Sequence, residues 1–204
     1  NRIGMPEAYT HFYDCIALTN IMIEPSNAMY SSDDGVVFNR EQSSLLIFPK
    51  GKMGPYTVPN SVTGIYIKAF SNTKYLTDVI LTTNLTSISD GAFVDSSLTS
   101  IFLPSSISDI GAGAFQGTRN LSAIIIPTTT TNISEYAFSG CVSLNSIVIP
   151  DNVKDVGPGA FQECASLTNV VLSMGANNIK SRTFNDCVSL ASISIPVNEC
   201  SRFD

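Results

Sequence analysis

The cysteines are the residues of this sequence whose type and spacing could do chemistry, either as metal ligands or as disulfides. Four of the five lie three residues after a phenylalanine: Cys15, Cys141, Cys164 and Cys187. A zinc site needs cysteine or histidine ligands that are paired at short spacing, and no segment provides such a pair. The spacing of the cysteines therefore predicts no metal site.

The same cysteines occupy one position of a repeated unit, and Thr73, Ser96 and Thr118 occupy that position in other copies. Interchange of thiol and hydroxyl side chains indicates a small, tightly packed position. Stacked copies would place the sulfurs in a row about 5 Å apart, but side chains that point the same way make poor disulfide geometry. We expect reduced, buried thiols at this position, with a Cys187–Cys200 bridge as the main exception.

Other groups that could support catalysis or metal binding are sparse. His11 is the single histidine, and it offers no basis for a Ser/His/Asp or Cys/His arrangement. The acidic residues are scattered over turns, with neither a glycosidase-like pair nor a calcium-loop motif. Asp33-Asp34-Gly35 is typical of a tight turn, which we favour over a metal site. The sequence thus predicts a protein that is not an enzyme and needs no cofactor.

The elements that position these residues come from a repeat of 22 or 23 residues. Its clearest marker is a phenylalanine at positions 70, 93, 115, 138, 161 and 184. A period this regular indicates an array of stacked structural units, each burying its apolar face against its neighbours. We expect the phenylalanine rings to form one row inside that array.

Each copy also carries a Leu-x-x-Ile-x-Ile segment that begins six residues after the phenylalanine. This is the strand portion of a leucine-rich repeat, in which apolar residues point inward and the residues between them point outward. A second apolar pair, such as Val153 and Val156, marks the returning half of the coil. The pattern predicts a leucine-rich-repeat solenoid, an α/β-class horseshoe of mostly short parallel strands with loops and short helical turns.

We predict a single leucine-rich-repeat domain over residues 1–204. Leu45-Leu46-Ile47-Phe48-Pro49 is expected to form a strand that ends in proline, as the repeat strands do. The expected parts are an irregular first repeat (1–25), an inserted β-hairpin segment that continues the sheet (26–55), regular repeats (56–196) and a C-terminal end (197–204) that caps the last coil or trails free.

Charge and hydropathy exclude some classes of partner. The chain has 11 basic and 17 acidic residues, a net charge of −6 and a pI near 4.6, which argues against nonspecific binding to nucleic acid or to an anionic membrane surface. No run of 18 apolar residues exists, so we expect no membrane insertion. The sequence starts inside a repeat at Asn1 without a signal peptide, and we expect it to be a piece of something longer.

One stretch resembles a known repeat family at nearly every fixed position. The segment from Ile147 to Leu167 reads IVIPDNVKDVGPGAFQECASL. It resembles the BspA-like leucine-rich repeats of bacterial and protist surface proteins, whose pattern is I-x-I-P-x-x-V-x-x-I-G-x-x-A-F-x-x-C-x-x-L. The resemblance implies an extracellular protein, on the cell surface or secreted, that is used in adhesion or contact with a host.

The outward positions of the predicted strands suggest where such a protein would bind. Stacked coils would turn these positions into an apolar row along the concave sheet: Met22, Ile80, Phe102, Ile125, Val148 and Val171. A parallel row of small or polar residues flanks it and includes Asp78 and Asn169. Contiguous exposed apolar surface tends to mark interaction sites. The hypothesis is a noncatalytic recognition module that binds an extracellular protein or glycan through this face.

An alternative explanation needs no ligand. β-Branched residues favour a pleated strand, so the apolar row could reflect sheet formation in a structural spacer that holds another domain away from the cell surface. The sequence leaves this choice open, together with the identity of the ligand and the oligomeric state. Substitution of the row would discriminate between the two functions.

Overall fold

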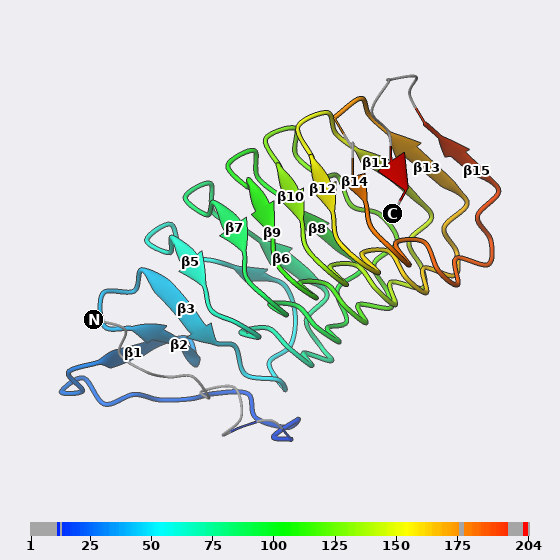
Figure 1. Ribbon diagram of the computed structural model, residues 1–204. Coiled ribbons are helices and arrows are strands. Elements are labelled where there is room, and N and C mark those ends of the chain that lie inside the picture. The colour runs from blue at the N-terminus through cyan, green and yellow to red at the C-terminus, as the bar shows by residue number, and fades with distance from the viewer. Residues whose placement is uncertain (1–11, 13, 176–177, 196–201, 204) are drawn as a thin grey trace.

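The protein is a stack of coils in which every coil contributes short strands joined by turns (Figure 1). The computed structural model describes residues 12, 14–175, 178–195 and 202–203. Buried apolar side chains form one continuous hydrophobic core along the stack, from Val36 to Cys187. The leucine-rich-repeat solenoid predicted from the 22–23-residue period is therefore confirmed.

One side of the stack carries the strands predicted from the Leu-x-x-Ile-x-Ile segments. They pair in parallel as two three-stranded sheets, and each strand steps to its neighbour in constant register. The first sheet consists of β4 (Tyr56–Thr57), β6 (Asp78–Ile80) and β8 (Ser100–Phe102), and the second of β11 (Ser146–Ile149), β13 (Asn169–Leu172) and β15 (Ser192–Ser194). We call this side the long-strand face.

Between the two sheets, residues 121–127 form no strand. This coil nevertheless keeps the same inward and outward alternation, because Ile124 and Ile126 are buried and Ile125 is exposed. The apolar core is therefore continuous where the strand pairing is interrupted.

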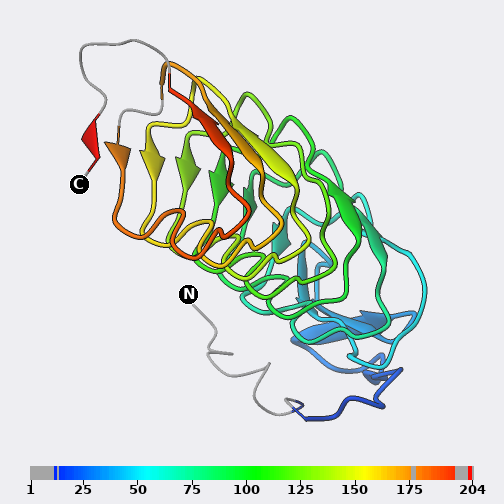
Figure 2. The ribbon, with the colours of Figure 1, turned by 90° about the vertical axis from the view of Figure 1, so that its right-hand side faces the viewer.

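The opposite side of the stack carries a second row of parallel strands, which the sequence-based prediction did not include. This six-stranded sheet contains β7 (Ser87–Ile88), β9 (Asp109–Ile110), β10 (Asn132–Ile133), β12 (Asp155–Val156), β14 (Asn178–Ile179) and β16 (Arg202–Phe203). Its arrows face the viewer in Figure 1, with the long-strand face behind them, and Figure 2 shows both rows from the side. We call this side the short-strand face.

The short helical turns that were predicted as part of this fold class are absent, because the described residues contain no helix. The backbone explains why. Each regular coil has two residues with positive φ, one on either side of the phenylalanine, for example Lys68 (58°) and Asn72 (56°) around Phe70. A left-handed residue interrupts a right-handed helix, so the chain turns sharply at this point.

In the inserted segment at 26–55, strands form at the predicted Val36-Val37-Phe38 and within the predicted Leu45-Leu46-Ile47-Phe48-Pro49, and a strand that was not predicted precedes them. β1 (Tyr30–Asp33) and β2 (Val36–Asn39) are antiparallel strands joined by a turn at Asp34 and Gly35. β3 (Ser44–Ile47) pairs with β2 on one side and in parallel with β5 (Gly64–Ile65) on the other.

The register of β3 corrects our expectation for Leu45 to Pro49. Leu45 pairs with Ile65, and β5 lies in the row of the short-strand face (Figure 1). The segment therefore joins the array through the returning half of a coil and not as a strand of the long-strand face. The proline after Phe48 misled the prediction, because prolines follow the long strands in the other repeats.

The predicted row of phenylalanines is confirmed. Each of the rings from Phe70 to Phe161 is fully buried, and successive ring centroids are 5.0–5.3 Å apart with interplanar angles of 13° or less. Phe184 continues the row at 5.7 Å but is only partly buried. Phe48 starts it, with its ring centroid 5.0 Å from that of Phe70. This ladder fixes the spacing of the coils.

The last long strand departs from the predicted burial. Ile193 and Ile195 hold inward positions in and next to β15, but they expose 37% and 40% of their surface. No described strand pairs with the far edge of β15, so these side chains lack the neighbouring coil that buries their counterparts Val170 and Leu172.

Candidate binding surface

The predicted apolar row lies on the long-strand face. Ile80 and Phe102 are register partners in β6 and β8, and Val148 and Val171 are register partners in β11 and β13. Ile125 lies in the coil between the two sheets. We call these five side chains the stripe.

The stripe points into solvent although it is apolar. Ile80 exposes 60% of its surface, Phe102 72%, Ile125 77% and Val148 57%, while Val171 is half-buried. The residues on either side of each stripe position point inward because side chains alternate along a strand, as Val79 and Leu81 show by their burial. The stack therefore presents large apolar side chains one coil apart, at the spacing set by the phenylalanine ladder.

Met22 was predicted to belong to this row, and the structure places it elsewhere. Residues around Met22 form no strand. The Ile21 N–H donates to the carbonyl of Gly35 at 3.1 Å and the Ile23 N–H to Ser32 Oγ at 2.9 Å, so this segment runs along the β1–β2 hairpin. The register partner of Ile80 in the first strand of the face is Thr57.

The first repeat does reproduce the local turn of later repeats. The Cys15 N–H donates to the carbonyl of Phe12 at 3.1 Å and the Leu18 N–H to that of Cys15 at 3.0 Å. Cys141 and Leu144 make the same two bonds in a regular coil. The resemblance ends after Leu18, where the chain turns toward the hairpin instead of forming a long strand.

The row beside the stripe is polar, and its two predicted binding residues bond to neighbouring coils. Ser100 Oγ donates to Asp78 Oδ1 at 3.2 Å, and Ser192 Oγ donates to Asn169 Oδ1 at 2.7 Å. Asp78 and Asn169 are half-buried. One acceptor oxygen of each is thus engaged in the sheet, which leaves Asp78 Oδ2 and the Asn169 amide nitrogen as the groups that could face a ligand.

The cysteine row is structural. The thiols of Cys141, Cys164 and Cys187 each donate to the carbonyl of the phenylalanine in the preceding coil, at 3.1–3.2 Å. Thr118 Oγ1 makes the equivalent bond to Phe93 at 2.9 Å. The shared bond requires a small donor, which explains the interchange of cysteine and threonine at this position.

Raised pKa values also suppress the reactivity of the Cys141 and Cys164 thiols. Burial raises the pKa of Cys141 to about 12, and the hydrogen bond with Cys187 together with burial raises the pKa of Cys164. No disulfide joins Cys15, Cys141, Cys164 and Cys187 to one another. The prediction of reduced, buried thiols holds for the last three and is wrong for Cys15, which is exposed because no described coil precedes it. Cys200 lies outside the described residues, so the Cys187–Cys200 bridge stays a prediction.

The remaining candidates for chemistry form no site. The described residues include no group of histidine, cysteine and acidic side chains that could hold a metal ion. Asp34 and Gly35 have positive φ angles of 46° and 77° and form the predicted hairpin turn. An ion pair of 2.9 Å between Lys52 Nζ and Asp34 Oδ2 ties that turn to the following loop. His11 lies outside the described residues.

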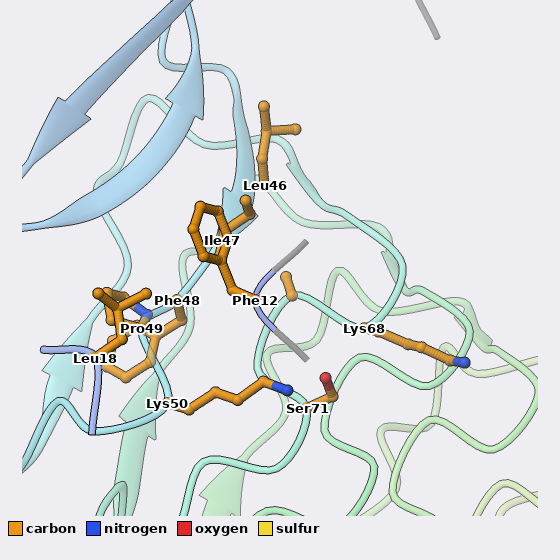
Figure 3. Close-up of a pocket in the computed structure, with 10 residues that line it drawn as sticks. Phe12, Leu18, Leu46, Ile47, Phe48, Pro49, Lys50, Lys68 and Ser71 are labelled. Carbon is orange, nitrogen blue, oxygen red and sulfur yellow. The ribbon is translucent and has the colours of Figure 1, made fainter. Parts of the chain in front are cut away.

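A small hollow lies where the first repeat packs against the segment from Leu46 to Lys50. Figure 3 shows Phe12 and Leu18 of the first repeat next to Ile47, Phe48 and Pro49, while Leu46 points away from them. Its volume of about 10 Å³ is far below the hundreds of Å³ of a ligand pocket. Lys50 lines this hollow and exposes 7% of its surface. This burial lowers the pKa of its ammonium group.

Within the described ranges, no helix has the length and apolar character needed to cross a bilayer.

Comparison with known proteins identifies the repeat. The family described as BspA type leucine rich repeat region matches residues 46–130 and 86–203, in six copies. A search of curated proteins gives no significant match.

Solved structures of leucine-rich-repeat proteins share the fold. A leucine-rich repeat protein of Eubacterium ventriosum superposes with a TM-score of 0.77 at 25% sequence identity, over 87% of this chain and 49% of that chain. The leucine-rich repeat protein of T. pallidum has a TM-score of 0.69 at 28% identity, over 83% and 80%. A leucine rich cell surface protein of Faecalibacterium prausnitzii has a TM-score of 0.62 at 24% identity, over 91% and 44%. The chain thus spans about half the length of the first of these proteins.

Proposed function

The chain belongs to the BspA-type leucine-rich repeat family, and we propose that it is a noncatalytic recognition module that binds a protein or glycan through the stripe. We place it on the cell surface or in the secreted fraction. This location rests on the family resemblance and on the likeness in fold to a leucine rich cell surface protein of F. prausnitzii.

The observation that carries the proposal is the difference between the two faces of the same stack. Both faces are built from parallel strands; each two-residue strand of the short-strand face has one outward residue, whereas strands such as β6 and β8 have two, one in the polar row and one in the stripe. On the short-strand face these outward residues are polar: Ser87, Asp109, Asn132, Asp155 and Asn178. If strand propensity alone selected apolar outward residues, both faces would carry them. The apolar row occurs on one face only, which favours an interaction surface.

The polar row of the short-strand face has a role within the fold. Asn132 Nδ2 donates to Asp109 Oδ1 and Asn178 Nδ2 donates to Asp155 Oδ1, both at 2.8 Å. These side chains bond to one another across neighbouring coils. The stripe side chains cannot make such bonds, because they are apolar.

A spacer role is the second candidate, and the phenylalanine ladder favours it. An uninterrupted row of stacked rings gives each coil the same contacts as the next. This suits a stiff, elongated element whose length is set by the number of coils. A spacer needs no apolar stripe, so the two functions make opposite predictions for substitution of the stripe.

The test is a glycan and matrix-protein binding array with the wild-type domain and the variant Phe102→Ser/Ile125→Ser/Val148→Ser. The matched control is Met53→Ser/Val188→Ser, because these two side chains expose 74% and 82% of their surface outside the stripe. We expect a signal that the control keeps and the stripe variant loses, with circular dichroism showing that both remain folded. A folded stripe variant that keeps every wild-type signal would favour the spacer.

A further inference from the structure

A groove runs along the turns of the stack, at the edge where the left-handed residues flank the phenylalanine. It consists of two adjoining hollows with volumes of about 330 and 410 Å³. The hollows share four lining residues, Val94, Asp95, Gln116 and Tyr136, so they form one continuous depression across several coils. The stripe residues do not line it.

The groove exists because residue size varies at two adjacent positions of the repeat. The two residues that lie three and two positions before the phenylalanine are Ile67-Lys68 and Glu135-Tyr136 in the outer coils, but Asp90-Gly91 and Ala112-Gly113 in the coils between them. Gly91, Ala112 and Gly113 line the bottom of the groove, and the larger side chains at 67–68 and 135–136 line its two sides.

One wall is an aromatic ring held in place by the backbone. Tyr136 has a φ of 54° and exposes 37% of its surface. A Cβ atom added to Gly159 would lie 2.6 Å from the Tyr136 ring, so the ring packs directly on the glycine of the next coil. The ring is therefore fixed in position beside the groove.

The groove is acidic. Four carboxylates line it, from Asp90, Asp95, Glu135 and Glu163, against the two cations Lys68 and Arg119. Asp90 Oδ1 accepts a hydrogen bond from the Ala112 N–H at 2.8 Å and is part of the fold. Asp95 and Glu135 are exposed, and neither forms an ion pair with another described residue.

We propose that this groove binds an arginine-bearing segment of a partner protein. A guanidinium group is planar, bonds carboxylates through its fork of N–H donors and stacks on aromatic faces. The groove offers both kinds of contact in one hollow, with carboxylates at Asp95 and Glu135 and a fixed ring at Tyr136. The charge of the groove complements that of the segment, and the floor of glycine and alanine leaves room for the chain of the partner.

The test measures fluorescence anisotropy of a labelled peptide, Gly-Ser-Arg-Ala-Arg-Ser-Gly, with the wild-type domain at low salt. Its control peptide carries citrulline in place of arginine, which keeps the shape of the side chain and removes the charge. We expect binding of the arginine peptide, weak binding of the citrulline peptide and a loss of affinity as salt rises toward the physiological range.

Two variants locate the binding. Asp95→Asn/Glu135→Gln removes two charges from the groove and should weaken binding about fivefold for each exposed pair that is lost. Its control, Glu24→Gln/Asp186→Asn, removes the same charge elsewhere, and Asp186 holds the position of Asp95 in a later coil. Ala112→Ile fills the floor with the residue type that position 67 already carries, so the fold should persist while binding is lost.

The results separate this site from the stripe. Phe102→Ser/Ile125→Ser/Val148→Ser should leave arginine-peptide binding unchanged, whatever it does to array ligands. Equal binding of both peptides, equal loss in the groove and control variants, or full binding by Ala112→Ile would overturn the proposal. So would an absence of arginine-peptide binding, or a neutral glycan that binds the groove in a Tyr136-dependent manner in its place.

Discussion

Truncation of one ring in the middle of the phenylalanine ladder should destabilise the whole stack. Phe138 is fully buried, and its ring is stacked between those of Phe115 and Phe161 at 5.2 Å on each side. Phe138→Ala removes this buried side chain and leaves a cavity, which costs about 3–5 kcal/mol of unfolding free energy in protein cores. This is a large fraction of the roughly 5–15 kcal/mol that holds a typical domain together.

Two further variants divide that cost. Each stacked pair contributes about 0.5–1.5 kcal/mol beyond its buried area, so Phe138→Leu, which restores much of the apolar volume, should lose about 1–3 kcal/mol. Phe184 has a described ring neighbour on one side only, at 5.7 Å, and is partly buried. Phe184→Ala should therefore cost clearly less than Phe138→Ala.

The assay is urea unfolding followed by circular dichroism, with the free energy obtained by linear extrapolation. A repeat array can lose cooperativity when one coil is weakened, so a second transition in Phe138→Ala would support the same account. A loss under about 1 kcal/mol for Phe138→Ala, or equal losses for Phe138→Ala and Phe184→Ala, would refute the idea that the ladder holds the coils together.

Three other perturbations test the turns and the thiol row. Cys15 should react quickly with a thiol reagent, and Cys141 only after denaturation. The pKa of Cys141 is raised to about 12 in the folded state, so the unfolded state loses this proton at lower pH than the folded state does. The free energy of unfolding should therefore fall as pH rises above about 9. Gly140→Ala should cost about 1–2 kcal/mol through backbone strain, because Gly140 has a φ of 71° and an added Cβ would lie 3.6 Å from the nearest atom. The control Gly64→Ala has similar room and no positive φ, so its stability should stay within about 0.5 kcal/mol of wild type. Equal effects of the two substitutions would show that strain is absent. Thr118→Val should cost about 1 kcal/mol by losing its hydrogen bond to the Phe93 carbonyl, while Thr118→Cys, which restores a donor, should be nearly neutral in the same unfolding assay.

The repeat could be predicted because each coil repeats its core residues at nearly the same spacing. The inward positions and the buried ring row follow from that spacing alone. Phe48 was missed as the first ring, although it lies 22 residues before Phe70, because Ile47 replaces the usual alanine and Gly51 replaces the usual cysteine or threonine. The period was present, but the residues that mark it elsewhere were not.

The short-strand face could not be found from alternation. Its strands span two residues, as in Ser87–Ile88, and two residues contain too little alternation to distinguish a strand from a turn. The left-handed turns were hidden for a related reason. Gly113 and Gly117 signal positive φ, but Tyr136 and Glu163 adopt it at equivalent places, where the sequence carries no such signal.

Of the two candidate sites, one could be predicted from the sequence and the other could not. The stripe was predictable because outward residues follow from inward ones, except at Met22, where the chain leaves the array to pack along the hairpin. The groove was not predictable, because it depends on how small residues in one coil meet large residues such as Tyr136 in the next.

The affinity of Phe102→Ser for a ligand tests most directly whether the stripe is a binding surface. Phe102 is a large stripe side chain with 72% of its surface exposed, so its loss should change unfolding free energy by only about 1 kcal/mol. At the centre of an interface it should cost about 2 kcal/mol or more of binding free energy, roughly a thirtyfold loss. Titration calorimetry with a ligand identified by the array gives this value for Phe102→Ser beside Met53→Ser. We expect a large loss of affinity in Phe102→Ser and none in Met53→Ser. Equal affinity of wild type and Phe102→Ser would show that the stripe is not the binding surface.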